Sequence, residues 1–135
     1  MNLAELNAFA ERYAAAWCGQ DPARVAAFFA EGGSLCVNDA PPAAGRAAIA
    51  DLALGFMTAF PDLVVTKDKL VTRPDGAEFH WTLTGTNTGP GGTGHRVRIS
   101  GYEEWQIDSN GLIANSQGHF DGAEYARQLA HGVEG

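Results

Sequence analysis

Hydrophobic positions in the first sixty residues recur at the spacing of helices. Apolar side chains three and four residues apart mark one face of a helix over residues 3–18, and they are Leu6, Phe9, Tyr13 and Trp17. A second, short helix is predicted from Pro22, with Asp21 as its N-cap, and we expect it to end at Gly32 and Gly33. A third helix is predicted from Arg46 to a stop at the FPD sequence of residues 60–62.

From residue 63 onward, the pattern changes to the alternation that is typical of strands. The strands predicted after a short one at residues 34–37 cover residues 63–73, with an irregularity at 68–69, then 78–88, 96–107 and 112–120. A final short helix is expected at 122–129. Helices followed by a run of strands predict an α+β fold, with helices packed on one face of an antiparallel sheet. Such a sheet curls around its helices and leaves a blind pocket.

Composition supports one domain over residues 1–135 with a large core. Hydrophobic residues make up 45% of the 135 residues, and aromatic residues make up 10%. The net charge of −7 disfavours nucleic acid and anionic membranes as partners. No apolar run approaches the roughly 20 residues of a membrane span. Because the first residues lack a basic stretch before an apolar one, we expect no signal peptide and a cytoplasmic location.

The two cysteines form neither a metal-binding spacing nor a disulfide framework. We expect Cys18 and Cys36 to be reduced, small, buried hydrophobic residues. The histidines lack a helical i, i+4 pair, so no metal site is predicted.

Glu103 is the first candidate for chemistry. The apolar face of the strand over residues 96–107 is expected to point inward, and its members are Val97, Ile99, Gly101, Glu103, Trp105 and Ile107. A carboxylate among such neighbours is costly to bury unless it is paired or protonated, which makes it a functional candidate. Two alternatives remain: a β-bulge that shifts the face, or an arginine partner at the pocket edge.

Asp121, at the end of the last predicted strand, is the second candidate. If that strand is regular, one face carries the polar side chains Asn115, Gln117, His119 and Asp121. Such a face is useful in a pocket, where a general base needs to reach the substrate proton. The alternative is equally open, because an aspartate before a glycine and a helix is also an ordinary N-cap.

Tyr13 is the third candidate, since it lies on the inner face of the first helix with Trp17 one turn later. A buried phenol needs a partner and could polarise a ligand carbonyl. It could equally be a core residue whose hydroxyl bonds to a neighbour.

Taken in order, several stretches resemble one family over nearly the whole chain. They are RYAAAWCGQD at 12–21, VAAFFAEGGSL at 25–35, FPDL at 60–63, WTLTGTNTG at 81–89, TGHRVRISGYEEW at 93–105, DSNGLI at 108–113, HFD at 119–121 and RQLA at 127–130. The chain resembles the SnoaL-like polyketide cyclases, or ester cyclases, of the nuclear transport factor 2-like superfamily. That resemblance implies a cone-shaped α+β barrel with one deep pocket, in which a curved sheet of mixed or antiparallel strands wraps around the N-terminal helices.

The resemblance also implies roles for single residues. The general acid/base of the cyclases falls on Asp121, the enolate-binding tyrosine of the steroid isomerases on Tyr13, and their protonated acid near Glu103. The steroid isomerase base falls loosely on Asn38 and Asp39, where an asparagine would remove it. A histidine common in the family is replaced by Asn87, which puts a histidine-assisted step in doubt.

These expectations combine into one hypothesis and two alternatives. The hypothesis is a cofactor-free cyclase or isomerase that acts on a small apolar carbonyl ligand and forms a homodimer through its outer strand faces. The residues expected to bind the substrate are Trp17, Asn38, Phe56, Trp81, Trp105, Gln117 and His119. One alternative is a non-catalytic ligand-binding or dimerisation module. The other is an epoxide hydrolase, which needs an arginine between two aspartates, whereas Arg98 lies on the face opposite Glu103.

Overall fold

The computed structural model describes residues 1–134, and it contains four helices and a six-stranded sheet among them. The helices are α1 (Leu3–Cys18), α2 (Pro22–Ala26), α3 (Arg46–Ala59) and α4 (Gly122–His131). The strands are β1 (Phe29–Val37), β2 (Ala43–Ala44), β3 (Val64–Arg73), β4 (Gly76–Thr86), β5 (Arg96–Ile107) and β6 (Ile113–Phe120). The α+β prediction is confirmed, and within the described residues no helix has the length and apolar character needed to cross a bilayer.

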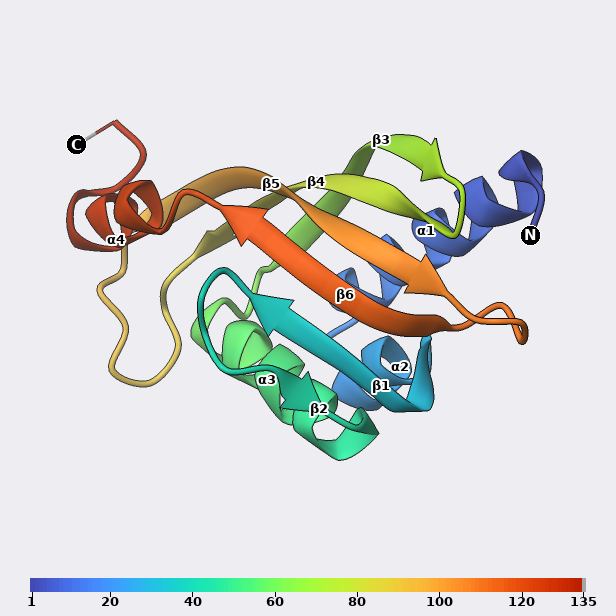
Figure 1. Ribbon diagram of the computed structural model, residues 1–135. Coiled ribbons are helices and arrows are strands. Elements are labelled where there is room, and N and C mark those ends of the chain that lie inside the picture. Colours follow the sequence, from blue (N-terminus) through green and yellow to red (C-terminus); the bar gives the residue numbers. More distant parts are fainter. Residues whose placement is uncertain (135) are drawn as a thin grey trace.

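The sheet runs in the order β2-β1-β6-β5-β4-β3 and curves over the first three helices (Figure 1). Its neighbouring strands are antiparallel with one exception, because β1 pairs in parallel with β6. The sheet is therefore mixed, which agrees with the predicted curved sheet of mixed or antiparallel strands. Helix α4 lies at the end of the sheet where β6 finishes (Figure 1).

Local signals explain where the helices begin. Asn2 caps α1 in a capping box with Glu5, and Asp21 accepts a hydrogen bond from the backbone N–H of Arg24 at the start of α2. The predicted bounds of α1 are confirmed, and α3 ends one residue before Phe60.

Strand β1 is longer than the sequence suggests, and the predicted helix stop at Gly32 and Gly33 is wrong. Helix α2 ends at Ala26, and both glycines lie inside β1. The strand is irregular there, because its register against β6 shifts between Phe29 and Ser34. A Cβ at Gly33 would lie 2.9 Å from the Ile113 carbonyl oxygen, so glycine permits this close approach to β6.

The core between helices and sheet is built largely from aromatic rings. Tyr13 of α1 is fully buried, and it packs edge-on against Phe28, Phe79 and Trp105 with ring centroids 5.3–5.5 Å apart. Phe79 and Trp105 stack face to face on neighbouring strands. Cys18 departs from its prediction, because it is exposed at the end of α1 and its sulfur accepts a hydrogen bond from the Val65 N–H.

Candidate functional site

A cavity of about 70 Å³ lies on the inner face of the sheet and is almost entirely apolar. Its walls come from α1, α3, α4 and five of the strands, and the lining residues are Trp17, Leu35, Val37, Leu52, Phe56, Val65, Phe79, Trp81, Leu83, Ile99, Glu103, Gly118, Phe120 and Tyr125. Glu103 is the one carboxylate in this lining. An apolar cavity with few polar groups is the usual form of a small-molecule site.

The carboxylate of Glu103 is held by three neighbouring donors. Its Oε1 accepts hydrogen bonds from Ser116 Oγ at 2.7 Å, Trp105 Nε1 at 3.0 Å and Tyr13 Oη at 3.1 Å. Its Oε2 lies 3.2 Å from the same Tyr13 hydroxyl and has no other partner among the described residues. The two oxygens therefore differ, since Oε1 is saturated with donors and Oε2 is nearly free.

Burial sets the acidity of this group. The Glu103 residue is only 8% exposed, and loss of hydration raises the pKa of its carboxyl, against the opposing effect of the three hydrogen bonds. Burial and the adjacent carboxylate also raise the pKa of Tyr13 well above its ordinary value. No lysine or arginine within residues 1–134 pairs with Glu103, so the arginine alternative is excluded for this part of the chain.

The sheet register explains why Glu103 reaches the cavity. Glu103 on β5 lies between Phe79 on β4 and Gly118 on β6, so its inward neighbours are a ring on one side and no side chain on the other. An added Cβ at Gly118 would lie 3.9 Å from Glu103 Cγ. Glycine at this position thus leaves space beside the carboxyl group.

The predicted site residues that lie near Glu103 divide into two groups. Trp17, Phe56 and Trp81 line the cavity. Tyr13 and Trp105 do not line it, and instead they lie behind Glu103 and donate to its carboxylate. The structure therefore brings the sequence candidates Tyr13 and Glu103 into direct contact.

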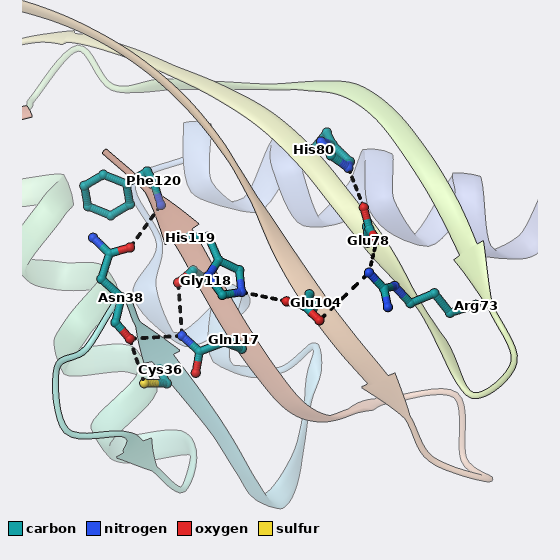
Figure 2. Close-up of polar contacts among 10 residues, drawn as sticks. All are labelled: Cys36, Asn38, Arg73, Glu78, His80, Glu104, Gln117, Gly118, His119 and Phe120. Atoms are coloured by element: carbon teal, nitrogen blue, oxygen red, sulfur yellow. Dashed lines mark hydrogen bonds and ion pairs between the residues drawn. The ribbon is translucent and has the colours of Figure 1, made fainter. Parts of the chain in front are cut away.

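The polar face of β6 does not form a cavity wall, which corrects the expectation for Asn115, Gln117 and His119. Ser116, Gly118 and Phe120 occupy the inner face instead. On the outer face, His119 Nε2 lies 2.6 Å from Glu104 Oε1 (Figure 2). The sequence pattern indicates the wrong side here, because two amides and an imidazole on one face are typical of a pocket wall, whereas the structure places them on the outer face of the sheet.

Asn38 also lies outside the cavity lining and has a structural role. Its Oδ1 accepts a hydrogen bond from the Phe120 N–H, and its carbonyl oxygen accepts one from the Gln117 side chain (Figure 2). Asn38 adopts a positive φ of 51°, a conformation that asparagine tolerates better than most residues. It therefore fastens the end of β1 to the end of β6, and together with Gln117 and His119 it lines a separate depression outside the sheet.

Asp121 is the N-cap of α4, which is the second of the two roles that the sequence allows for it. It is exposed, it is not among the residues that line the cavity, and its side chain accepts a hydrogen bond from the Glu124 N–H at the start of α4. The structure therefore does not bring Asp121 together with Glu103 and Tyr13.

The sequence model of the SnoaL-like polyketide cyclases matches residues 7–129. The chain belongs to the SnoaL-like polyketide cyclase family. A search of curated protein sequences found no match.

Solved structures share the SnoaL-like fold at low sequence identity. A candidate SnoaL-like cyclase from Jannaschia sp. CCS1 has a TM-score of 0.81 and 13% identity, over 95% of this chain and 93% of that one. A protein of ketosteroid isomerase-like fold from Catenulispora acidiphila, in complex with trimethylamine, has a TM-score of 0.79 and 17% identity, over 90% and 91%. The epoxide hydrolase/cyclase-like SalBIII of salinomycin pyran-ring formation has a TM-score of 0.77 and 15% identity, over 89% and 93%.

Sequence reasoning missed several residues of this SnoaL-like site. Ser116 donates the shortest hydrogen bond to Glu103, and Gly118, Phe120 and Tyr125 complete the wall. The signal was present in the alternation of β6, where a serine, a glycine and a phenylalanine share one face. Within residues 1–134, no group of three or more potential metal ligands lies together.

Proposed function

We propose that this SnoaL-like protein is a cofactor-free enzyme of the cyclase or isomerase type, which moves a proton on an apolar carbonyl substrate with Glu103 as its general acid/base. The observation that carries the proposal is a buried acid, without a cationic partner among the described residues, in the wall of an apolar cavity. A buried acid with a perturbed pKa is a characteristic of catalytic sites.

The proton transfer follows from the two oxygens of Glu103. Ionised Glu103 takes a proton from the carbon next to the substrate carbonyl, through the lightly bonded Oε2. The electron pair of that C–H bond moves into the carbonyl to form an enolate, and Glu103 becomes the neutral acid. Desolvation favours this neutral form, and the same proton can then return to the product.

Tyr13, Trp105 and Ser116 are positioning residues in this scheme. Their hydrogen bonds fix Oε1 and therefore orient the carboxylate toward the cavity. Their donation also offsets part of the cost of burying the ionised form, which keeps a fraction of Glu103 available as a base.

Epoxide hydrolysis receives less support, although one structural neighbour is named for it. Arg98 is exposed on the outer side of β5 and does not line the cavity. The described cavity wall contains one carboxylate and no arginine, whereas that reaction in the related enzymes needs an arginine between two aspartates. We also propose a cytoplasmic location, in keeping with the free thiols of Cys18 and Cys36.

Exchange of carbon-bound hydrogen tests the proposed chemistry without knowledge of the natural substrate. The probes are 2-tetralone and 1-indanone in deuterated buffer, and mass spectrometry follows incorporation of deuterium beside the carbonyl. We expect the protein to accelerate exchange, and Glu103→Gln to reduce that acceleration by about 10²–10⁴-fold. Glutamine keeps the shape and can accept the bonds of Ser116 and Trp105, so the fold should survive.

Asp121→Asn is the matched control for the second acid. Asparagine can still cap α4, and we expect exchange at the wild-type rate because Asp121 lies outside the cavity wall. Loss of exchange in Asp121→Asn together with its retention in Glu103→Gln would overturn the assignment of Glu103. If the wild type does not accelerate exchange of either ketone, the result favours the non-catalytic ligand-binding module.

A further inference from the structure

Trp81 carries a hydrogen-bond donor that the fold leaves without a partner. Its indole Nε1 is buried and has no acceptor among the described protein groups, and it is the one side-chain nitrogen or oxygen of residues 1–134 in this condition. The same side chain lines the apolar cavity that contains Glu103. A buried donor without an acceptor is destabilising, so such groups are rare in folded proteins.

The packing of Gly101 and Phe120 around Trp81 fixes the position of its indole ring. Trp81 lies opposite Gly101 on β5, and a Cβ at Gly101 would come within 2.8 Å of Trp81 Cζ2, so glycine makes room for the indole. Phe120 packs against the indole at a centroid distance of 6.0 Å. By contrast, the indole of Trp105 on the neighbouring strand donates to Glu103. The unpaired donor therefore belongs to one of the two tryptophans that line the cavity, and Trp105, which lies behind Glu103, has its donor paired.

We propose that the Trp81 indole N–H recognises the carbonyl oxygen of the ligand and donates to the enolate oxygen as negative charge develops there. This inference rests on the proposed function, and it adds a substrate-binding group to the acid/base. A donor of fixed position in an apolar site is worth more than in water, because no solvent competes for the oxygen. Since Nε1 is closed to solvent in this structure, a small rotation of the indole accompanies binding.

The sheet geometry places the Trp81 indole and the Glu103 carboxyl group close enough for a single carbonyl compound to contact both. Phe79 is directly opposite Glu103, and Trp81 follows two residues later on the same inward face of β4. Trp81 and Glu103 are thus diagonal neighbours, whose backbone positions are about 7–8 Å apart in an antiparallel pair. A ligand whose oxygen meets the indole N–H therefore presents its adjacent carbon toward the carboxylate.

The unpaired N–H also selects between two classes of ligand. Aromatic walls with a carboxylate can bind an ammonium cation, and a structural neighbour holds trimethylamine. An ammonium group has no acceptor, however, and would leave the Trp81 donor unpaired inside the complex. A neutral carbonyl compound satisfies both Trp81 and Glu103, and for this reason the structure favours it.

NMR spectroscopy of the three indole N–H groups tests the contact directly. Wild-type protein labelled with nitrogen-15 is titrated with 2-tetralone and 1-indanone, and in parallel with the hydrocarbons tetralin and indane. We expect the ketones to move the Trp81 Nε1–H resonance downfield, and the hydrocarbons to leave it without a downfield shift. The resonance is assigned by its absence in Trp81→Phe.

The affinities of the protein for each ketone and for its matching hydrocarbon provide a second measurement. Trp81→Phe removes the donor and keeps a ring, so we expect it to reduce the ketone-to-hydrocarbon affinity ratio by about tenfold. Trp17→Phe is the matched control, because it shrinks another tryptophan of the same wall and should change both affinities together. The ratio, rather than either affinity, reports the hydrogen bond, since a change in cavity volume affects both ligands.

Each outcome distinguishes this inference from the proposed function. Failure of the ketones to bind, equal shifts with ketone and hydrocarbon, or an unchanged ratio in Trp81→Phe overturns the role of Trp81. Tighter binding of tetramethylammonium than of either ketone also overturns it. If Trp81→Phe fails to fold, the other two indole resonances are assigned by their absence in Trp17→Phe and Trp105→Phe, and the remaining wild-type resonance still decides the question. Deuterium exchange separately decides the role of Glu103, because the Trp81 measurements record binding and not turnover.

Discussion

At the scale of single residues, the environment of Glu103 combines two opposing effects. Three donors stabilise its ionised form, while the loss of hydration favours the neutral form and prevails. The group therefore lies between the behaviour of a surface acid and that of a neutral buried one. This balance suits a residue that must both accept and return a proton.

The raised pKa of Glu103 predicts how stability depends on pH. The unfolded chain ionises this group near its ordinary value of 4.5, and the folded protein holds the proton to higher pH. Stability that the protonated group contributes is fully present below the unfolded pKa and is lost as pH rises through the folded pKa. We expect the free energy of unfolding of wild type, minus that of Glu103→Gln, to fall with pH by at most about 1.4 kcal/mol per pH unit.

Urea denaturation of both proteins from about pH 4 to about pH 8 measures this difference. The comparison with Glu103→Gln is necessary because other acids act in the opposite direction. Hydrogen bonds from Arg127 and Gln128 lower the pKa of Glu124 to about 2, but that group is present in both proteins. A difference that stays constant or grows with pH contradicts a raised pKa for Glu103.

The identity of the central acid could be predicted from sequence, and the identity of its partners could not. The alternation of β5 shows Glu103 among apolar residues, and its burial is confirmed. The roles of Ser116 and of the unpaired Trp81 donor depend on which residues of β6 and β4 lie near Glu103. The alternation within a strand indicates which face a residue occupies, but the residue it lies opposite is fixed by the pairing of separate strands.

At the scale of elements, β5 is the strand that organises the site. It pairs with β4 over eleven register positions and with β6 along its second half, and it contributes both Glu103 and Gly101. Gly101 lies directly between the indole of Trp81 and the end of β6. The strand therefore needs a residue without a side chain at this position.

Gly101→Ala is expected to destabilise the protein by about 1–3 kcal/mol, because a crowded core cannot absorb the added methyl group. The new Cβ would meet the His119 carbonyl oxygen, Trp81 Cζ2 at 2.8 Å and Phe120 Cβ at 2.9 Å. Urea denaturation gives the free energy of unfolding. Gly32→Ala is the matched control, since nothing lies within 4 Å of its added Cβ, and a loss in the control as large as that in Gly101→Ala would contradict the steric explanation.

Long periodic elements were predictable, and elements fixed by long-range contacts were less so. The predicted bounds of α1 and β5 and the irregularity of β3 near Asp68 are confirmed, because each has a pattern within its own residues. The sequence predicts that β1 begins only at Ser34, because glycines normally interrupt an element, whereas in the structure β1 begins at Phe29 and Gly33 allows β6 to approach. The two-residue strand β2 is too short to leave a pattern.

At the scale of the whole molecule, the outer face of the sheet is the surface through which we expect two copies to associate. His80, Tyr102 and His119 form a ring stack across β4, β5 and β6, with centroids 5.1 and 4.7 Å apart. Glu78 and Glu104 lie beside the stack and both contact Arg73 (Figure 2). Aromatic and arginine side chains of this kind are enriched in protein interfaces.

Light scattering at micromolar concentration is expected to show a dimer for the wild type. Tyr102→Lys should yield a monomer, because it replaces the central ring of the stack with a charge on both copies. Thr72→Lys is the control, as it adds the same charge at an exposed position of the edge strand β3. A monomeric wild type contradicts the prediction.

The parallel pairing of β1 with β6 has a consequence for how the chain is made. Residues 34–37 pair with residues 115–118, and β6 lies between β1 and β5 in the sheet. During synthesis, the edges of β1 and β5 that pair with β6 stay unpaired until residues 113–120 have left the ribosome. Such distant contacts slow folding and expose strand edges to other chains. The cavity is therefore completed by β6, and a chain that stops before β6 has neither the joined sheet nor the wall formed by Gly118 and Phe120.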